Sequence, residues 1–107
     1  MPVLLCLSTC PDEASARAIA EALVDERLAA CVSRLPGVQS TYRWEGAVQH
    51  DAEVLLLIKT TADRLDALAA RLQVLHPYEL PELVAVEAAG GFAPYLAWVA
   101  AQTRRND

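Results

Sequence analysis

The segment from His76 to Glu82 gathers more potentially reactive side chains than any other stretch of this chain. It carries an imidazole, a phenol and two carboxylates within seven residues. Pro77 and Pro81 fix their own backbone φ and bias the residue before each of them towards extended geometry. Because the segment joins a helical pattern to an apolar strand pattern, we expect rigidly held polar groups at the edge of a sheet. Such groups form a site more often than those on a free loop.

Two residues are candidate metal ligands, His76 and Cys10. A neutral imidazole suits copper or zinc, and Cys10 can supply a thiolate at the end of the first expected strand. Cys10 also lies just before an expected helix, whose dipole lowers the pKa of a nearby thiol. The alternative for His76 is a hydrogen-bonded group that caps a helix end. His50 lies in a polar hairpin arm, where we expect it to be solvated.

A second candidate site is a ligand cleft lined by Trp44, Lys59, Tyr78 and Glu82. Lys59 is the only lysine of the chain and stands at the end of an apolar strand. An unpaired buried ammonium group is unfavourable, so we expect a carboxylate partner. Glu82 is the first choice, with Glu45 or Glu79 as alternatives. The cleft would bind a small anionic or polar ligand; the competing interpretation is an ion pair with aromatic packing at a subunit interface.

Composition excludes several classes of function. The formal net charge of −5 disfavours a nucleic-acid partner, which needs a basic face. No apolar run approaches the roughly 20 residues of a membrane span, so we expect no membrane partner. Three cysteines without paired spacing favour a reducing, cytoplasmic location. The sequence contains no phosphate loop, nucleophile elbow or zinc-hydrolase motif, and we expect no enzyme.

The expected elements form one domain over residues 1–107. Strands are expected at 3–7, at 29–44 with a bend at Pro36-Gly37, and at 83–88, with a further strand that returns from the turn at 45–46 and ends in 53–60. Helices are expected at 11–27, 62–75 and 95–103. Glu45-Gly46 predicts a tight hairpin turn, and Thr60 to Asp63 resembles a capping box. With right-handed crossovers this order predicts an α+β, ferredoxin-like βαββαβ sandwich with an extra C-terminal helix.

The expected strands are apolar on both faces. Val54, Leu56 and Ile58 point one way, and Leu55 and Leu57 the other. Two short helices can cover only one face of a sheet, so the second face must be buried elsewhere, most simply against another copy of the chain. The alternative is that the last helix covers the second face alone.

Several short motifs, in this order and spacing, resemble the CutA family of divalent-cation tolerance proteins. They are TCPDEA at 9–14, LAACV at 28–32, STYRWEG at 40–46, EVLLLIKT at 53–60, HPYELPE at 76–82 and YLAW at 95–98. The resemblance implies a ferredoxin-like protomer in a tight homotrimer, a cytosolic location and a role in tolerance of copper and other divalent metals. It also implies an architecture like that of the trimeric PII signalling proteins.

The resemblance also places the copper ligands that some bacterial members are assigned. They are a cysteine near the end of the first strand and a His-His pair, and the corresponding positions here hold Ser8, Leu75 and His76. Only the last is a ligand type found at its expected place, so we expect weak metal binding. The leading hypothesis is a non-enzymatic homotrimer that binds copper or another divalent cation through His76, with Cys10 as a second ligand. The alternatives are a PII-like sensor of a small anionic ligand at subunit clefts, and a scaffold for trimeric presentation.

Overall fold

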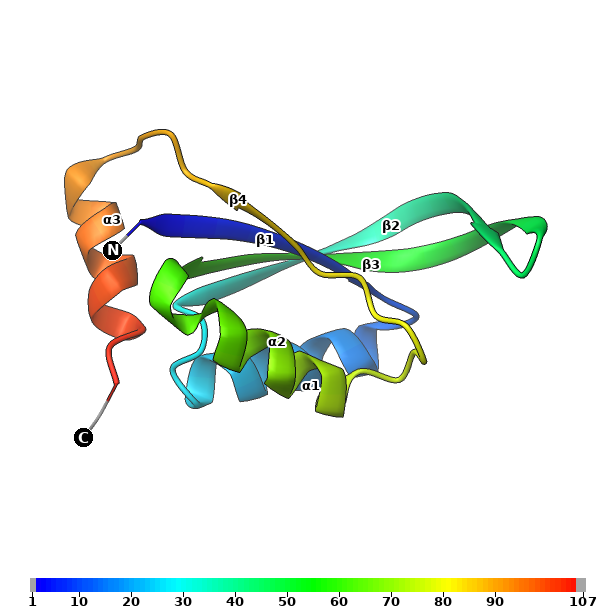
Figure 1. The fold of residues 1–107 in the computed structure, drawn as a ribbon, viewed down its shortest axis with the longest axis horizontal. Helices are drawn as coiled ribbons and strands as arrows, with labels where there is room; N and C mark the ends of the chain where they lie inside the picture. The colour runs from blue at the N-terminus through cyan, green and yellow to red at the C-terminus, as the bar shows by residue number, and fades with distance from the viewer. Residues whose placement is uncertain (1, 106–107) are drawn as a thin grey trace.

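Two helices cover one face of a four-stranded antiparallel sheet, and a third helix stands at one end of it (Figure 1). The structure, a computed structural model, describes residues 2–105. In chain order the elements are β1 (Val3–Cys10), α1 (Glu13–Asp25), β2 (Cys31–Trp44), β3 (Ala47–Thr61), the 3-10 turn η1 (Ala62–Arg64), α2 (Leu65–Leu75), β4 (Val84–Glu87) and α3 (Ala93–Gln102). The strands lie in the order β2-β3-β1-β4. The mixed α+β class and the sequence of elements expected from the chain are confirmed.

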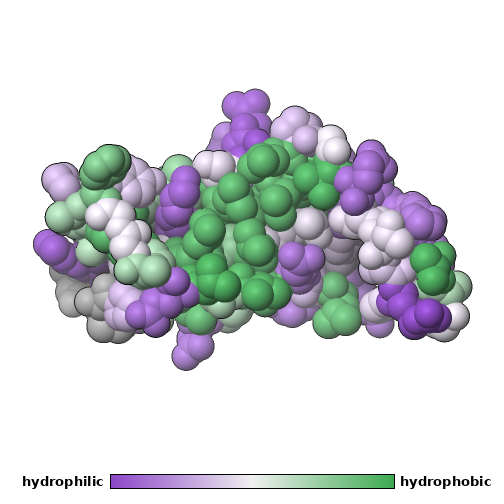
Figure 2. All heavy atoms as spheres, turned by 90° about the horizontal axis from the view of Figure 1, so that it is seen from above, coloured by the Kyte–Doolittle hydropathy of each residue, from purple (hydrophilic) through white to green (hydrophobic). Residues whose placement is uncertain are grey.

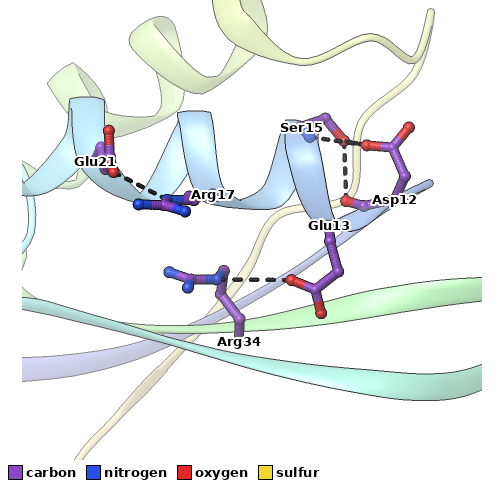
Figure 3. Close-up of polar contacts among 6 residues, drawn as sticks. All are labelled: Asp12, Glu13, Ser15, Arg17, Glu21 and Arg34. Carbon is purple, nitrogen blue, oxygen red and sulfur yellow. Dashed lines mark hydrogen bonds and ion pairs between the residues drawn. The ribbon is translucent and has the colours of Figure 1, made fainter.

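α1 begins at a side-chain cap. The Asp12 carboxylate accepts the backbone N–H of Ser15 at 2.8 Å, and these hydrogen bonds hold the pKa of Asp12 below its usual value (Figure 3). At the same end of the helix, the Glu13 carboxylate lies 3.9 Å from the guanidinium of Arg34 on β2. The helix turns Ile19 and Leu23 into the core, where both are almost fully buried. The acidic helix start therefore caps α1 and links it to β2.

The expected capping box at the start of α2 is wrong. Thr61 precedes η1 and makes no side-chain capping bond. The Thr60 hydroxyl instead donates to the Leu28 carbonyl at 2.7 Å, and the Thr61 hydroxyl lies 3.0 Å from that of Thr103. Both hydroxyls point into the interior, because these residues are the buried end of β3 and hold the neighbouring loop and α3 in place.

β2 and β3 form one long hairpin that extends beyond the rest of the sheet (Figure 1). The expected turn is confirmed: Glu45 and Gly46 have φ values of 50° and 80°, and both signs suit the twist of a two-residue hairpin. The expected bend is also confirmed, since the pairing register shifts between Leu35 and Val38. The hairpin therefore has two parts: the end beyond the bend, here called the arm, and the part before the bend, which lies in the body of the sheet.

The sheet face opposite α1 and α2 is open and apolar. Figure 2 shows hydrophobic side chains gathered over the middle of this face. Leu35, Val84 and Val86 are 40%, 51% and 49% exposed. α3 does not cover them, because it lies at one end of the sheet and buries Val99 there. The alternative in which the last helix alone covers the second face is wrong.

Candidate functional site

His76 ends α2 and is held by hydrogen bonds on both ring nitrogens. Nε2 lies 2.7 Å from the carbonyl oxygen of Thr9, and Nδ1 lies 3.1 Å from the backbone nitrogen of Tyr78. A backbone N–H can only donate, so Nδ1 accepts and Nε2 carries the proton that goes to Thr9. The residue is only 7% exposed. This arrangement is the hydrogen-bonded helix end that the sequence left open as the alternative for His76.

Cys10 is the nearest sulfur to this ring. Its Sγ lies 3.8 Å from His76 Nε2, although the two residues are 66 positions apart in the chain. The side chain is fully buried. Desolvation, aided by the charges of Asp12 and Glu53, raises the pKa of the thiol to about 11. The expectation of a lowered pKa is therefore wrong, because burial outweighs the helix dipole.

The donor set is small for a metal centre. Within residues 2–105, no three His, Cys, Asp or Glu side chains lie close enough to share an ion. The Ser8 hydroxyl is fully buried and is left without a hydrogen-bond partner in the same range. Leu75 packs against the hydrophobic core. Cys10 and His76 are thus the only two of the expected ligand positions that place donor atoms together.

The structure contains an aromatic cleft, but its lining residues differ from those predicted. A cavity of about 750 Å³ lies between the β2–β3 arm and the segment that follows His76, and Trp44, Tyr78 and Glu82 line it. Lys59 does not. Thr9, Ser40, Tyr42 and Glu53 also line it, and none of these four was among the predicted cleft residues. The alternation in β2 places Ser40, Tyr42 and Trp44 on one face, and that signal was visible. Glu53 was not predictable, because its position opposite Val38 depends on the shifted register.

Two phenol–carboxylate pairs organise this cavity. The Tyr78 hydroxyl donates to Glu53 Oε2 at 2.7 Å, and the Tyr42 hydroxyl donates to Asp51. Burial is the main cause that raises the pKa of Tyr78 well above its usual value, and the hydrogen bond to Glu53 is the next largest. The hydrogen bond to Asp51 also raises the pKa of Tyr42. Both phenols therefore stay protonated and donate their hydrogen bonds to the two carboxylates.

Lys59 lies on the open sheet face, away from the cavity. Its Nζ is 3.4 Å from the Ser33 hydroxyl and 3.8 Å from Cys31 Sγ. No carboxylate of residues 2–105 forms an ion pair with it. The expected bond to Glu82 is wrong, because β3 carries Lys59 beside Cys31 in the sheet body. The cavity therefore lacks Lys59, the cation that the predicted anion-binding cleft relied on.

His50, which was expected to be solvated, lies outside both candidate sites. His50 is exposed on the arm, and its Nδ1 lies 3.0 Å from the Thr41 hydroxyl across the hairpin. Among residues 2–105, no helix is both long enough and apolar enough to span a membrane.

Comparison with known proteins agrees with the fold over almost the whole chain. Residues 4–102 match the family model of the CutA1 divalent ion tolerance protein. A divalent-cation tolerance protein CutA from Thermus thermophilus is 52% identical over 97 residues, covering 91% of this chain and 94% of that protein. The crystal structure of CutA from Xylella fastidiosa is 49% identical with a TM-score of 0.94, covering 97% of this chain and all of that one. CutA1 from Oryza sativa is 40% identical with a TM-score of 0.95, covering 99% and 97%. These descriptions name a tolerance protein and no catalytic activity, and the chain belongs to the CutA1 family of divalent ion tolerance proteins.

Proposed function

We propose that this protein acts in divalent-cation tolerance as a non-enzymatic, cytoplasmic homotrimer that binds copper or another divalent cation weakly at Cys10 and His76. The observation that carries the metal-binding part is the 3.8 Å separation of Cys10 Sγ and His76 Nε2. Two ligands of one ion span roughly 3.5 Å at a tetrahedral angle and about 4.3 Å when opposed, taking metal–sulfur and metal–nitrogen distances of about 2.3 and 2.0 Å. The observed separation falls inside this range.

Binding at this pair competes with protons and with hydrogen bonds. With the thiol pKa at about 11, roughly one Cys10 in 10,000 is ionised at pH 7. A ligand role for Nε2 also moves the ring proton to Nδ1, where it opposes the backbone N–H of Tyr78. The contact with Thr9 is lost as well. These costs support modest affinity, and the thiolate favours a soft ion such as copper(I).

The test is a copper(I) and zinc titration of the reduced protein against a chromophoric chelator. We expect copper binding to strengthen about tenfold per pH unit from pH 7 to 9, since one thiol proton is released. Cys10→Ser and His76→Gln should each abolish it, while His50→Ala, the matched control, should not. Copper binding of equal strength in Cys10→Ser, or none in the wild type at pH 9, would contradict the assignment.

The homotrimer is supported by the open sheet face and by unpaired strands at both sheet edges. β2 and β4 form the edges, and unpaired edges are templates for pairing with another chain. The three half-exposed side chains of Leu35, Val84 and Val86 lie over this face. Lys59 is half-buried on the same face, and within residues 2–105 no carboxylate forms an ion pair with it. A carboxylate from a neighbouring copy would complete such a pair. Sedimentation equilibrium at low micromolar concentration should give three times the chain mass; a monomer mass would refute the assembly.

A further inference from the structure

We propose that the cavity beside Tyr78 binds a small organic ammonium cation, with Glu53 as its anchoring carboxylate. This goes beyond metal tolerance and does not rest on the Cys10–His76 site. All the side chains involved come from one chain, and the cavity volume of about 750 Å³ lies within the range of small-molecule sites.

Glu53 is the observation that points to a cation. Its side chain lines the cavity, yet the residue is only 8% exposed. One carboxylate oxygen, Oε2, accepts the Tyr78 hydroxyl at 2.7 Å. Among the three ion pairs of the described residues, none includes Glu53. Glu53 thus presents a carboxylate without a cationic partner in the described residues to the cavity, and a cationic ligand would supply that partner.

The rest of the lining carries more negative than positive charge. Glu79 and Glu82 add two carboxylates at the rim, against one guanidinium, that of Arg43. The Arg43 side chain is already engaged, because its Nη1 donates to the Gly46 carbonyl at the hairpin turn at 3.4 Å. The cavity is therefore negative, which attracts cations into a partly enclosed space.

The walls favour an organic cation over a metal ion. Tyr42, Trp44 and Tyr78 are aromatic, and the negative face of an aromatic ring attracts an ammonium group. The carboxylates do not converge: within residues 2–105 no three acidic, His or Cys side chains are grouped as metal ligands. A single carboxylate with aromatic neighbours matches an ammonium group, whose N–H bonds reach Oε1 while its carbon chain contacts the rings.

The experiment compares two probes of equal length, putrescine dihydrochloride and neutral 1,4-butanediol, at constant ionic strength. In a Trp98→Phe background, Trp44 is the only tryptophan of the chain and reports occupancy by its fluorescence. We expect saturable binding of putrescine and none of butanediol. Equal binding of the two would overturn the proposal in favour of a merely apolar cavity, and no saturable binding of putrescine would also overturn it.

Variants locate the site and separate it from the metal site. Glu53→Gln keeps the acceptor for Tyr78 but removes the charge, and should weaken putrescine binding at least tenfold. Glu82→Gln, at the exposed rim, should weaken it less and tests the charge without disturbing a buried group. Glu21→Gln, an exposed carboxylate of α1, is the matched control and should bind as wild type does. Cys10→Ser should also bind putrescine normally; unchanged affinity in both Glu53→Gln and Glu82→Gln would refute the site.

Discussion

Replacing Tyr78 with phenylalanine removes one oxygen atom and, with it, the only hydrogen bond that the Glu53 carboxylate receives within residues 2–105. The ring remains, so its contact with His76, at a centroid distance of 4.8 Å, is kept. What is lost is the 2.7 Å bond from a phenol to a buried carboxylate. We expect the variant to fold and to be less stable.

The expected loss of unfolding free energy is about 1.5–3 kcal/mol, the range for hydrogen bonds to charged groups. The lower part of the range applies, because Glu53, although only 8% exposed, lines the cavity, from which water can replace the phenol. The pairing also links stability to pH. The pKa of Tyr78 is raised in the folded state, so unfolded tyrosine ionises first, above about pH 10. Stability from this pair is complete below that pH and falls above it.

The assay is urea denaturation at one fixed protein concentration, since unfolding and subunit dissociation are coupled if the chain is oligomeric. A double-mutant cycle with Glu53→Gln isolates the pairwise term. Tyr42→Phe is the matched control, because it breaks the same kind of bond, to Asp51, on the solvent-exposed arm. It should lower stability less than Tyr78→Phe does. A Tyr78→Phe variant as stable as wild type, with no coupling to Glu53, would refute the argument that this bond holds a buried charge.

Three further predictions follow from the buried groups and the open face. Because burial raises the pKa of Cys10 from 9.0 to about 11, the reduced protein should lose roughly 2 kcal/mol of stability between pH 9 and 11 that Cys10→Ser does not lose; identical pH profiles in denaturation would contradict this. Thr60→Val should lower the unfolding free energy by about 1–3 kcal/mol, since it leaves the Leu28 carbonyl without its donor, whereas an unchanged urea midpoint would mean that water takes the donor's place. Val86→Asp puts a charge on the apolar face and should shift sedimentation towards monomer; an unchanged assembly mass would exclude this face from the interface.

The local elements of the fold were predictable because short-range physics specifies them. The leucine period from Leu65 to Leu75 gives α2, and the two left-handed positions at Glu45 and Gly46 give the hairpin turn. The two-faced apolar strands also predicted that one sheet face stays uncovered by helices. Each of these signals lies within about a dozen residues and needs no knowledge of the packing.

The site was predictable only in part, because its contacts depend on register and burial. Cys10 and His76 were both named, but their closeness follows from the end of β1 meeting the end of α2. The raised thiol pKa could not be read from a position before a helix, because it comes from full burial. Lys59 was assigned to Glu82 since both are charged and near strand ends, yet the pairing of β3 with β2 sets it beside Ser33.

The strand order β2-β3-β1-β4 has a consequence for how the chain folds during its synthesis. β1 is made first but lies in the interior of the sheet, between β3 and β4. Its register joins Val3 to Thr61 and Leu4 to Glu87, so its first neighbour is complete only after residue 61 has left the ribosome. Such distant pairings are slow to form. The β2–β3 hairpin, whose contacts are local to its turn, can close beforehand and offer β1 a ready edge, which limits the time that the apolar N-terminal strand spends exposed to other nascent chains.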